Sequence, residues 1–301
     1  MEKAILKTLI YADIFDYPLR VYEIHKWLIG RKTTLRQVER ALKSLSKKLK
    51  VKSKKGYYFL PKKDGLVGKR ERGEEQSRSY LGKAKILVTI LKIIPWIKLV
   101  GISGGLAMGN AKKSDDIDLF IITSKSRLWL SRFFALSLLS LTGQRRRVSD
   151  TGRKIAGKLC LNILVEEEKL AQKNRDIYIA HEVLQMKVLW ERNGIYGKYL
   201  MDNEWVFRFL PNWITDTMSL RGAKRRSNLL NHSSSNKQIA TSAFGGLAMT
   251  MELLAKWIQL KIMEKPRGME RIEDGALYFH PNDIRPKILA KYKKRVKIYS
   301  L

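Results

Sequence analysis

The segment between residues 98 and 165 constrains the fold of this chain more than any other. Three short apolar runs lie at 98–102, 117–123 and 159–165, and a longer apolar run lies at 128–142. Short apolar runs bounded by turn residues predict buried strands, whereas a run of this greater length predicts a helix. The order of strand, glycine-rich turn, strand, helix and strand predicts an α/β fold around one sheet.

The composition shows that the chain can bury a core and that it favours anionic partners. Apolar residues make up 45% and charged residues 29% of its 301 residues, which excludes a disordered tail and suits two or three domains. Lys and Arg number 60 against 28 for Asp and Glu, a net charge of +32. Such an excess predicts a polyanionic partner, either nucleic acid or nucleotide phosphates.

The cysteine content and the apolar runs indicate in which cellular compartment we expect this protein. The single cysteine, Cys160, excludes an intrachain disulfide and a cysteine-based zinc site, so we expect a reducing, cytoplasmic setting. Asp13 and Asp16 interrupt the first apolar stretch, which argues against a secretory signal. The run 128–142 contains Arg132 and is shorter than the roughly 20 apolar residues of a membrane span. We therefore expect no membrane span.

Residues 1–61 predict a small domain of three helices followed by a basic hairpin. Thr33 or Thr34 can cap the third helix, and Gly56 lies in the hairpin turn. The third helix has an apolar stripe on one face and basic residues on the other. This order resembles the winged helix-turn-helix family, which implies contact with nucleic acid. The residues that would make the contact are Arg36, Arg40, Lys43, Lys54 and Lys55. The alternative is a packing or dimerisation domain whose charges are merely solvated.

The remaining chain divides by composition into a linker, a core and a helical end. We expect a linker, partly helical, at 62–83 and a core domain at 84–170 that begins with a helix at 84–96. Residues 171–301 predict a helical C-terminal domain, with helices at 176–192, 252–264 and 283–296. Residues 217–250 lack periodicity, and we interpret them as a tolerated surface insertion without function. An RNA-contacting loop is the alternative.

The residues that point to chemistry lie between Val100 and Thr123. Glycines at 101, 104, 105 and 109 follow a predicted strand and let backbone N–H groups approach phosphates. Asp116 and Asp118 open the next strand and share one of its faces, since side chains alternate along a strand. Two carboxylates beside a phosphate-binding turn indicate a magnesium site. The alternative is a solvated loop end, which does not explain the glycine spacing.

This segment resembles the nucleotidyltransferase superfamily, which includes DNA polymerase beta, poly(A) polymerases and CCA-adding enzymes. Ser103-Gly104-Gly105 matches the first part of the family pattern and Asp116-Ile117-Asp118 the second, although Ser103 stands where the family has an apolar residue. The match covers 24 of 301 residues. It implies a mixed-sheet nucleotidyltransferase core between an N-terminal winged helix and a C-terminal helical domain.

The resemblance also implies an activity. The protein would move a nucleoside monophosphate from a nucleoside triphosphate to a nucleic-acid or other macromolecular acceptor and release pyrophosphate. Asp116 and Asp118 would be catalytic and would hold Mg²⁺ in a two-ion site. The triphosphate would bind to Ser103, Gly104, Gly105 and Gly109. The acceptor, the base preference and the oligomeric state stay open.

The third carboxylate of active family members has no direct counterpart. Asn162 fills its expected place on the strand 159–165, and an amide brings no charge and cannot act as a base. Glu166 or Asp150 is a possible substitute. If neither replaces it, the alternative function is a catalytically degenerate, nucleotide-sensing regulator that binds DNA.

A few further residues have side chains suited to chemical roles. Arg127, Arg132, Arg145–Arg147 and Lys154 are candidates for phosphate contacts. His181-Glu182 begins a zinc-protease motif, but Gln185 stands where the second histidine ligand belongs, so we expect His181 to pack on a helix. Cys160 lies among apolar residues and predicts a buried small side chain.

Overall fold

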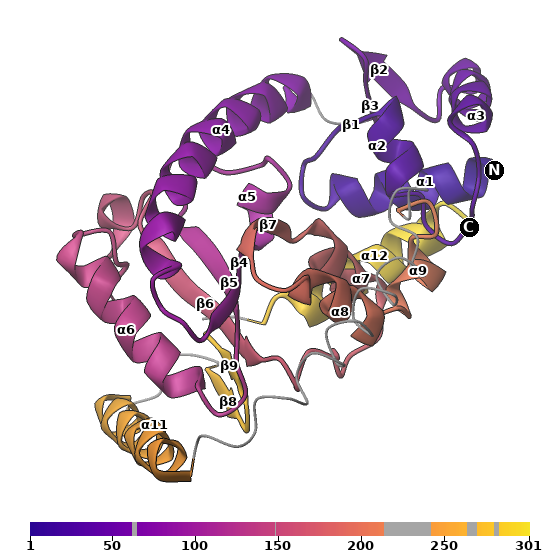
Figure 1. Ribbon diagram of the computed structural model, residues 1–301. Coiled ribbons are helices and arrows are strands. Elements are labelled where there is room, and N and C mark those ends of the chain that lie inside the picture. Colours follow the sequence, from indigo (N-terminus) through magenta and orange to yellow (C-terminus); the bar gives the residue numbers. More distant parts are fainter. Residues whose placement is uncertain (62–64, 148, 214–241, 264–269, 280–282) are drawn as a thin grey trace.

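The protein has a mixed α/β fold built on two sheets (Figure 1). The computed structural model describes the whole chain except residues 62–64, 148, 214–241, 264–269 and 280–282. A six-stranded sheet has the order β7-β4-β5-β6-β9-β8, and a three-stranded sheet has the order β1-β3-β2. The α/β class predicted from the apolar runs is thus confirmed.

The N-terminal part contains the three predicted helices and the predicted hairpin. Its elements are α1 (Glu2–Asp13), β1 (Leu19–Arg20), α2 (Val21–Lys26), α3 (Leu35–Lys47), β2 (Lys52–Lys54) and β3 (Tyr57–Phe59). Thr34 is the N-cap of α3: its hydroxyl accepts a hydrogen bond from the Gln37 backbone N–H (3.4 Å), and the Gln37 side chain accepts one from the Thr34 N–H (3.2 Å). This reciprocal pair satisfies two backbone donors and fixes the start of the helix. The arrangement as a winged helix-turn-helix stays a proposal.

A single long helix joins the N-terminal part to the core. α4 (Leu66–Leu91) covers most of the segment predicted as a linker and runs on into the helix predicted at 84–96. Arg70 of α4 pairs with Glu23 of α2 at 2.7 Å, and its guanidinium lies 3.7 Å from the centre of the Tyr17 ring. The segment at 66–83 is thus an ordered helix in contact with the N-terminal part.

The centre of the large sheet matches the predicted strands. β4 (Ile97–Ile102) runs antiparallel to β5 (Ile117–Thr123), which runs parallel to β6 (Leu159–Glu166). Alternation along β5 sends Leu119 into one apolar core with α4 and with α6 (Leu128–Leu141). Phe120 enters a second core with α7 (Ile177–Gln185) and α8 (Ile195–Asp202). The sheet is therefore covered by helices on both faces, as Figure 1 shows.

The prediction of a helical C-terminal domain is wrong at three segments, which form strands. The predicted helix 176–192 ends at Gln185, and β7 (Lys187–Glu191) pairs antiparallel with β4. β8 (Arg271–Glu273) and β9 (Ala276–Tyr278) form a hairpin that pairs with β6. β7 and β9 use the open backbone groups at the edges of β4 and β6, and β8 pairs with β9; this tertiary effect outweighs local helical preference. The helical elements after α8 are α9 (Val206–Phe209), α11 (Ser242–Ile262) and α12 (Arg285–Ile298).

The last two helices fit the predictions at 252–264 and 283–296, with shifted ends. The predicted insertion at 217–250 lies mostly outside the described residues, and its final part belongs to α11. α11 packs on α6 through Glu252, whose carboxylate accepts hydrogen bonds from the backbone N–H groups of Trp129 (2.7 Å) and Leu130 (3.0 Å). Glu252 thus satisfies backbone donors in the first turn of α6.

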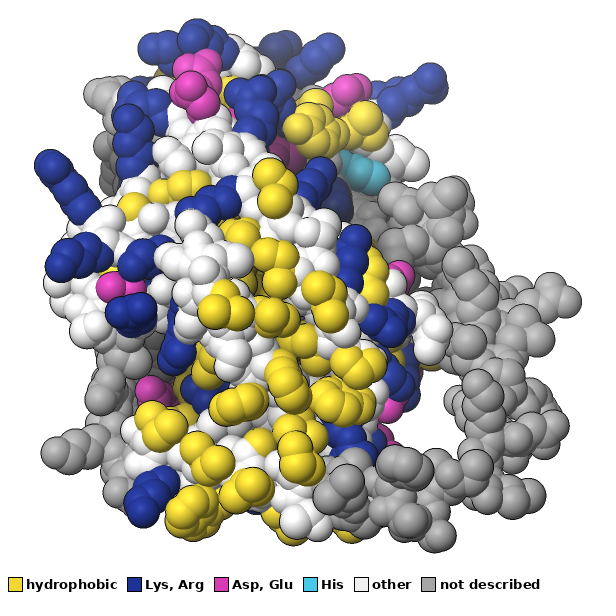
Figure 2. Space-filling model, turned by 60° about the vertical axis from the view of Figure 1, so that its left-hand side comes forward, with side chains coloured by type: hydrophobic (Ala, Val, Ile, Leu, Met, Phe, Trp, Pro, Cys, Tyr) yellow, Lys and Arg dark blue, Asp and Glu magenta, His cyan; other side chains and the backbone are white. Residues whose placement is uncertain are grey.

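Figure 2 shows apolar side chains gathered on the face that carries α4, α6 and α11. Large apolar side chains that stay exposed on these helices are Ile86, Phe133, Phe134, Leu141, Met249, Met251, Leu253, Leu254, Trp257 and Ile262. Lys and Arg side chains border this apolar surface. Among the described residues, we find no helix with both the length and the apolarity needed to cross a membrane.

Candidate functional site

The glycine-rich turn after β4 is held against β5. The Ser103 backbone N–H donates a hydrogen bond to the Asp118 carbonyl at 3.1 Å, and α5 (Gly104–Ala107) follows directly. Gly104 has φ +66°, a left-handed conformation that favours glycine, and a Cβ there would lie 3.4 Å from Asp118 Oδ2. The turn therefore brings exposed backbone close to a carboxylate.

Asp116 and Asp118 meet on one side of the sheet, as their spacing predicts. Asp118 is paired in register with Cys160 on the neighbouring parallel strand β6. Carboxylate oxygens of both aspartates and the Cys160 sulfur lie within 4.8 Å of one another. This clustering makes the pair a candidate site for a divalent cation.

The electrostatics of this cluster disfavour a second negative charge beside Asp116. Arg146 donates to Asp116 Oδ2 at 2.5 Å and so balances one carboxylate. Burial, together with the charge of Asp116, raises the pKa of Asp118 to about 8. Burial and the two aspartates raise the pKa of the Cys160 thiol to about 12. A second positive charge would therefore stabilise the ionised form of Asp118.

The donor set fits Mg²⁺ through its two carboxylates. Hard cations prefer carboxylate oxygen ligands, and Asp116 and Asp118 supply them from one strand face. The thiol of Cys160 is a soft ligand, so a hard cation such as Mg²⁺ would take its protein ligands from the two carboxylates and not from this sulfur. The expectation that Cys160 is only a small core residue is incomplete, because it is half-buried beside both aspartates.

Asn162 lies at an irregularity in the pairing of β5 with β6. Leu119 pairs with Leu161 but the next residue, Phe120, pairs with Ile163, so Asn162 is left as the extra residue. Asn162 is buried and lines the same pocket as Asp118. Cys160, and not Asn162, stands opposite Asp118 in the ladder.

The two substitutes considered for the third carboxylate lie elsewhere. Asp150 pairs with Lys158 at 3.0 Å, and neither residue lines the pocket that contains Asp118. Glu166 ends β6, where its backbone N–H donates to the Gly275 carbonyl at 2.8 Å. The structure therefore brings neither carboxylate to the Asp116–Asp118 pair.

The predicted phosphate-binding residues separate into two groups. Ser103, Gly104 and Gly105 line the pocket together with Asp118, whereas Gly109 does not. Among the arginines, Arg146 reaches Asp116, while Arg132 donates to the Gln259 side chain on α11 at 2.5 Å. Arg132 is thus part of the α6–α11 packing.

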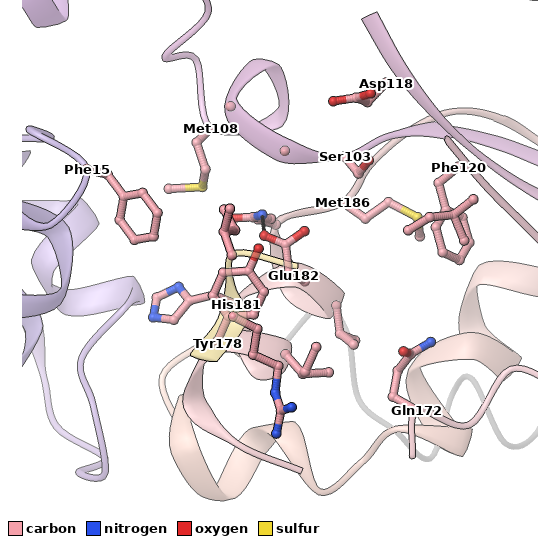
Figure 3. A pocket seen from close by; sticks show the side chains of 18 of the residues that line it. Phe15, Ser103, Met108, Asp118, Phe120, Gln172, Tyr178, His181, Glu182 and Met186 are labelled. Atoms are coloured by element: carbon pink, nitrogen blue, oxygen red, sulfur yellow. Dashed lines mark hydrogen bonds between the residues drawn. The ribbon is translucent and has the colours of Figure 1, made fainter. Parts of the chain in front are cut away.

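A pocket of about 540 Å³ opens from the glycine turn. Its walls come from α1, the central sheet, α7 and the C-terminal segments around 271–285. Many of the side chains that line it are aromatic, namely Tyr11, Phe15, Tyr17, Trp27, Phe120, Tyr178, Tyr199 and Tyr278. A volume in the range of about 300–1,000 Å³ is typical of small-molecule sites. The close-up in Figure 3 shows Ser103 and Asp118 on one side of this pocket and Phe15 on another.

Helix α7 brings two polar residues into this pocket that the sequence analysis did not select. Glu182 is partly accessible and lines the pocket; burial raises its pKa to about 7, and Gln185 donates a hydrogen bond to it. His181 is buried between the rings of Tyr11 (4.2 Å) and Trp27 (5.2 Å), and burial lowers its pKa to about 3. His181 packs on a helix, as expected.

A signal for Glu182 was present in the sequence. Tyr178, Glu182 and Gln185 are spaced by four and three residues, so they form a polar stripe on an otherwise apolar helix. Such a stripe points into a polar cavity when the rest of the helix packs in a core. The spacing alone does not say which cavity.

The predicted nucleic-acid contacts lie far along the chain from this cluster, on α3 and the β2–β3 hairpin. All five residues, Arg36, Arg40, Lys43, Lys54 and Lys55, are exposed. α3 buries Val38, Leu42 and Leu45 on its opposite face. Among the described residues, Lys55 makes an ion pair with Glu71 of α4 at 3.1 Å.

No protein-family model matches this chain, and no curated protein sequence is significantly similar to it. What the site does is therefore inferred from its own geometry and chemistry.

Proposed function

We propose that this protein is a Mg²⁺-dependent nucleotidyltransferase that uses a nucleoside triphosphate as donor. The observation that carries the proposal is the convergence of Asp118 and the turn at Ser103–Gly105 at one pocket, with the Asp116 carboxylate directly beside Asp118. Carboxylates beside a backbone turn suit a metal-bound triphosphate, since the turn offers N–H groups and the carboxylates hold the ion. A nucleic-acid or other macromolecular acceptor belongs to the same proposal.

The reaction is an in-line displacement at the α-phosphorus. A hydroxyl oxygen of the acceptor forms the new bond to this phosphorus and its proton passes to water, while the bond to the β-phosphate bridging oxygen breaks and pyrophosphate leaves with the electron pair. Bound Mg²⁺ would neutralise charge on the phosphates. Asp116 and Asp118 would hold the ion, and Gly104 leaves the backbone free of a side chain at the turn. Arg146 places one further positive charge next to Asp116.

The test is transfer of label from α-³²P nucleoside triphosphates in the presence of Mg²⁺. Pooled small RNA, total protein and buffer alone serve as acceptors. We expect transfer by the wild-type protein and its loss in Asp116→Asn and Asp118→Asn, which keep size and remove charge. Asp115→Asn is the matched control, because Asp115 is adjacent but caps the turn through the Lys112 N–H at 2.9 Å. Equal transfer by all three variants would refute the metal role of the pair.

A second candidate function is nucleic-acid binding by the N-terminal part. Its support is the exposed basic face of α3, which carries Arg36, Arg40 and Lys43 opposite the buried stripe. Coupled to a transferase fold without transfer, this would make the protein a nucleotide-sensing regulator. Phosphate contacts release counterions, so the logarithm of the affinity should fall steeply with the logarithm of salt concentration.

The test is duplex DNA binding by fluorescence anisotropy over a salt series. Replacing the three α3 residues by alanine should reduce the salt slope by up to about 3, since each phosphate contact contributes about 0.9. A matched control changes three equally exposed lysines on α12, namely Lys291, Lys293 and Lys294. If both triple variants lose affinity equally, binding is a property of the total charge and α3 is not the contact surface.

A further inference from the structure

The pocket beneath the N-terminal part has one end suited to phosphates and another suited to a flat ring. Ser103, Gly104 and Asp118 lie at the first end, and aromatic walls enclose the rest. Its volume of about 540 Å³ matches a mononucleotide and is too small for a nucleic-acid helix. A nucleotide whose phosphates lie at the glycine turn would direct its base toward the aromatic walls.

Polar groups in this pocket lack partners. Ser103 Oγ and His181 Nε2 are buried atoms that make no hydrogen bond in the described part of the chain. Buried polar atoms without partners destabilise the fold, so their presence around a cavity indicates a ligand that supplies hydrogen bonds. Ser103 and His181 are both more than nine-tenths buried and both line the pocket.

Glu182 adds a carboxylate to the same cavity. Its side chain accepts a hydrogen bond from Gln185, and within the described residues it makes no ion pair with Lys, Arg or His. Figure 3 shows Glu182 in the middle of the pocket, between Tyr178 on one side and Ser103 with Asp118 on the other. Burial raises the pKa of Glu182 to about 7, so above this pH its carboxylate is ionised and accepts hydrogen bonds only; its two oxygens still offer lone pairs beside the bond from Gln185. It therefore selects a ligand edge that carries N–H donors.

Guanine is the common base that matches such a carboxylate best. Its Watson–Crick edge offers two adjacent donors, N1–H and the 2-amino group, one for each carboxylate oxygen. Adenine and cytosine present an amino group next to a ring nitrogen that repels a carboxylate, and uracil presents a single N–H between two carbonyls. The flanking aromatic side chains suit stacking of any base, so the choice among bases falls to Glu182.

We propose that the pocket binds the nucleoside of the donor nucleotide and that Glu182 selects guanine through its N1–H and 2-amino group. The inference rests on the proposed function for one point, namely that the ligand is a nucleoside triphosphate. Glu182 is thereby a specificity-determining residue contributed by α7. Ser103 and His181 contribute buried polar atoms to the wall of the same pocket.

The experiment compares GTP with inosine triphosphate, which differs from GTP only in lacking the 2-amino group. Isothermal titration calorimetry with the full chain, Mg²⁺ and no acceptor measures both affinities. We expect the wild-type protein to bind GTP at least about tenfold more tightly than inosine triphosphate, because a charge-assisted hydrogen bond is lost. ATP, CTP and UTP should also bind more weakly than GTP.

The variant Glu182→Gln should bring the ratio of the two affinities close to one. Glu168→Gln is the matched control, since Glu168 is an exposed glutamate that does not line the pocket, and this variant should keep the wild-type ratio. The wild-type comparison does not depend on the folding of any variant. Equal wild-type affinities, a preference for another base, or a guanine preference that survives Glu182→Gln would each overturn the inference.

The outcome separates this inference from the proposed function. Label transfer without discrimination between GTP and inosine triphosphate overturns the role of Glu182 and leaves the transferase proposal standing. Guanine preference without transfer supports the pocket and refutes the transferase activity. Absence of binding for every triphosphate overturns the inference together with its basis.

Discussion

The side chain of His181 should make the stability of this protein depend on pH. Its ring lies between Tyr11 of α1 and Trp27, the residue that follows α2, so it joins α7 to the N-terminal part. Burial lowers its pKa from 6.5 to about 3. The unfolded chain takes up a proton near pH 6.5, whereas the folded protein stays neutral there until about pH 3.

The sign and the size of the effect follow from this difference. Between pH 6.5 and pH 3 the unfolded state binds more protons, so the free energy of unfolding decreases as pH falls through this range. Each pH unit contributes about 1.4 kcal/mol, and the total loss between pH 7 and pH 5 is about 2 kcal/mol. Stability from this group is fully present above pH 6.5.

Urea unfolding of the wild-type protein and of His181→Phe at pH 7 and pH 5 measures the effect. Phenylalanine keeps a flat ring between the two aromatic side chains and has no titrating group. Carboxylates and other histidines titrate alike in both proteins, so the difference between their free energies of unfolding isolates His181. We expect this difference to shift by about 2 kcal/mol in favour of the variant on going to pH 5. A constant difference would show that His181 is solvated and would refute the packing of α1 on α7.

Three further predictions concern stability. Glu252→Gln should destabilise the fold by about 1 kcal/mol in urea unfolding, because the charge that stabilises the first turn of α6 at Trp129 and Leu130 is lost; an unchanged midpoint would contradict this role. Gly104→Ala should cost about 1–2 kcal/mol through its left-handed backbone, and a stabilised variant would contradict that conformation. Gly82→Ala, by contrast, should stabilise the protein by up to about 1 kcal/mol, because residue 82 lies within α4 with open space around it; a lowered melting temperature would contradict the helical assignment.

Local sequence patterns predicted most elements of the core. They also predicted that Asp116 and Asp118 form a pair. The predicted strand 117–123 coincides with β5, and the predicted helix 128–142 differs from α6 by one residue at its end. These two elements could be predicted from the sequence because a continuous apolar run can be buried in few ways. The two aspartates share a face for the same reason, since alternation along a strand is a local property.

The sequence did not predict the features that depend on partners far away along the chain. β7 follows α7 directly, but it forms a strand because β4 offers an open edge there, nearly a hundred residues earlier in the chain. Glu182 lines the pocket because α7 packs over the pocket face of the sheet, which is also a tertiary effect. Asn162 was expected at the place of a third carboxylate; in the structure Cys160 pairs with Asp118, and Asn162 is the extra residue at an irregularity further along β6.

The sequence by itself determined the central strands β4, β5 and β6, the helix cap at Thr34, the glycine turn and the carboxylate pair, because each depends on residues close along the chain. The tertiary structure alone decided the edges of the sheet, the ion pair of Arg146 with Asp116, and the pocket that joins α1, α7 and the glycine turn. Their physical cause is non-local. Backbone groups at an open strand edge need hydrogen-bond partners, and buried charges and rings need complementary groups, and both kinds of partner can come from distant parts of the chain.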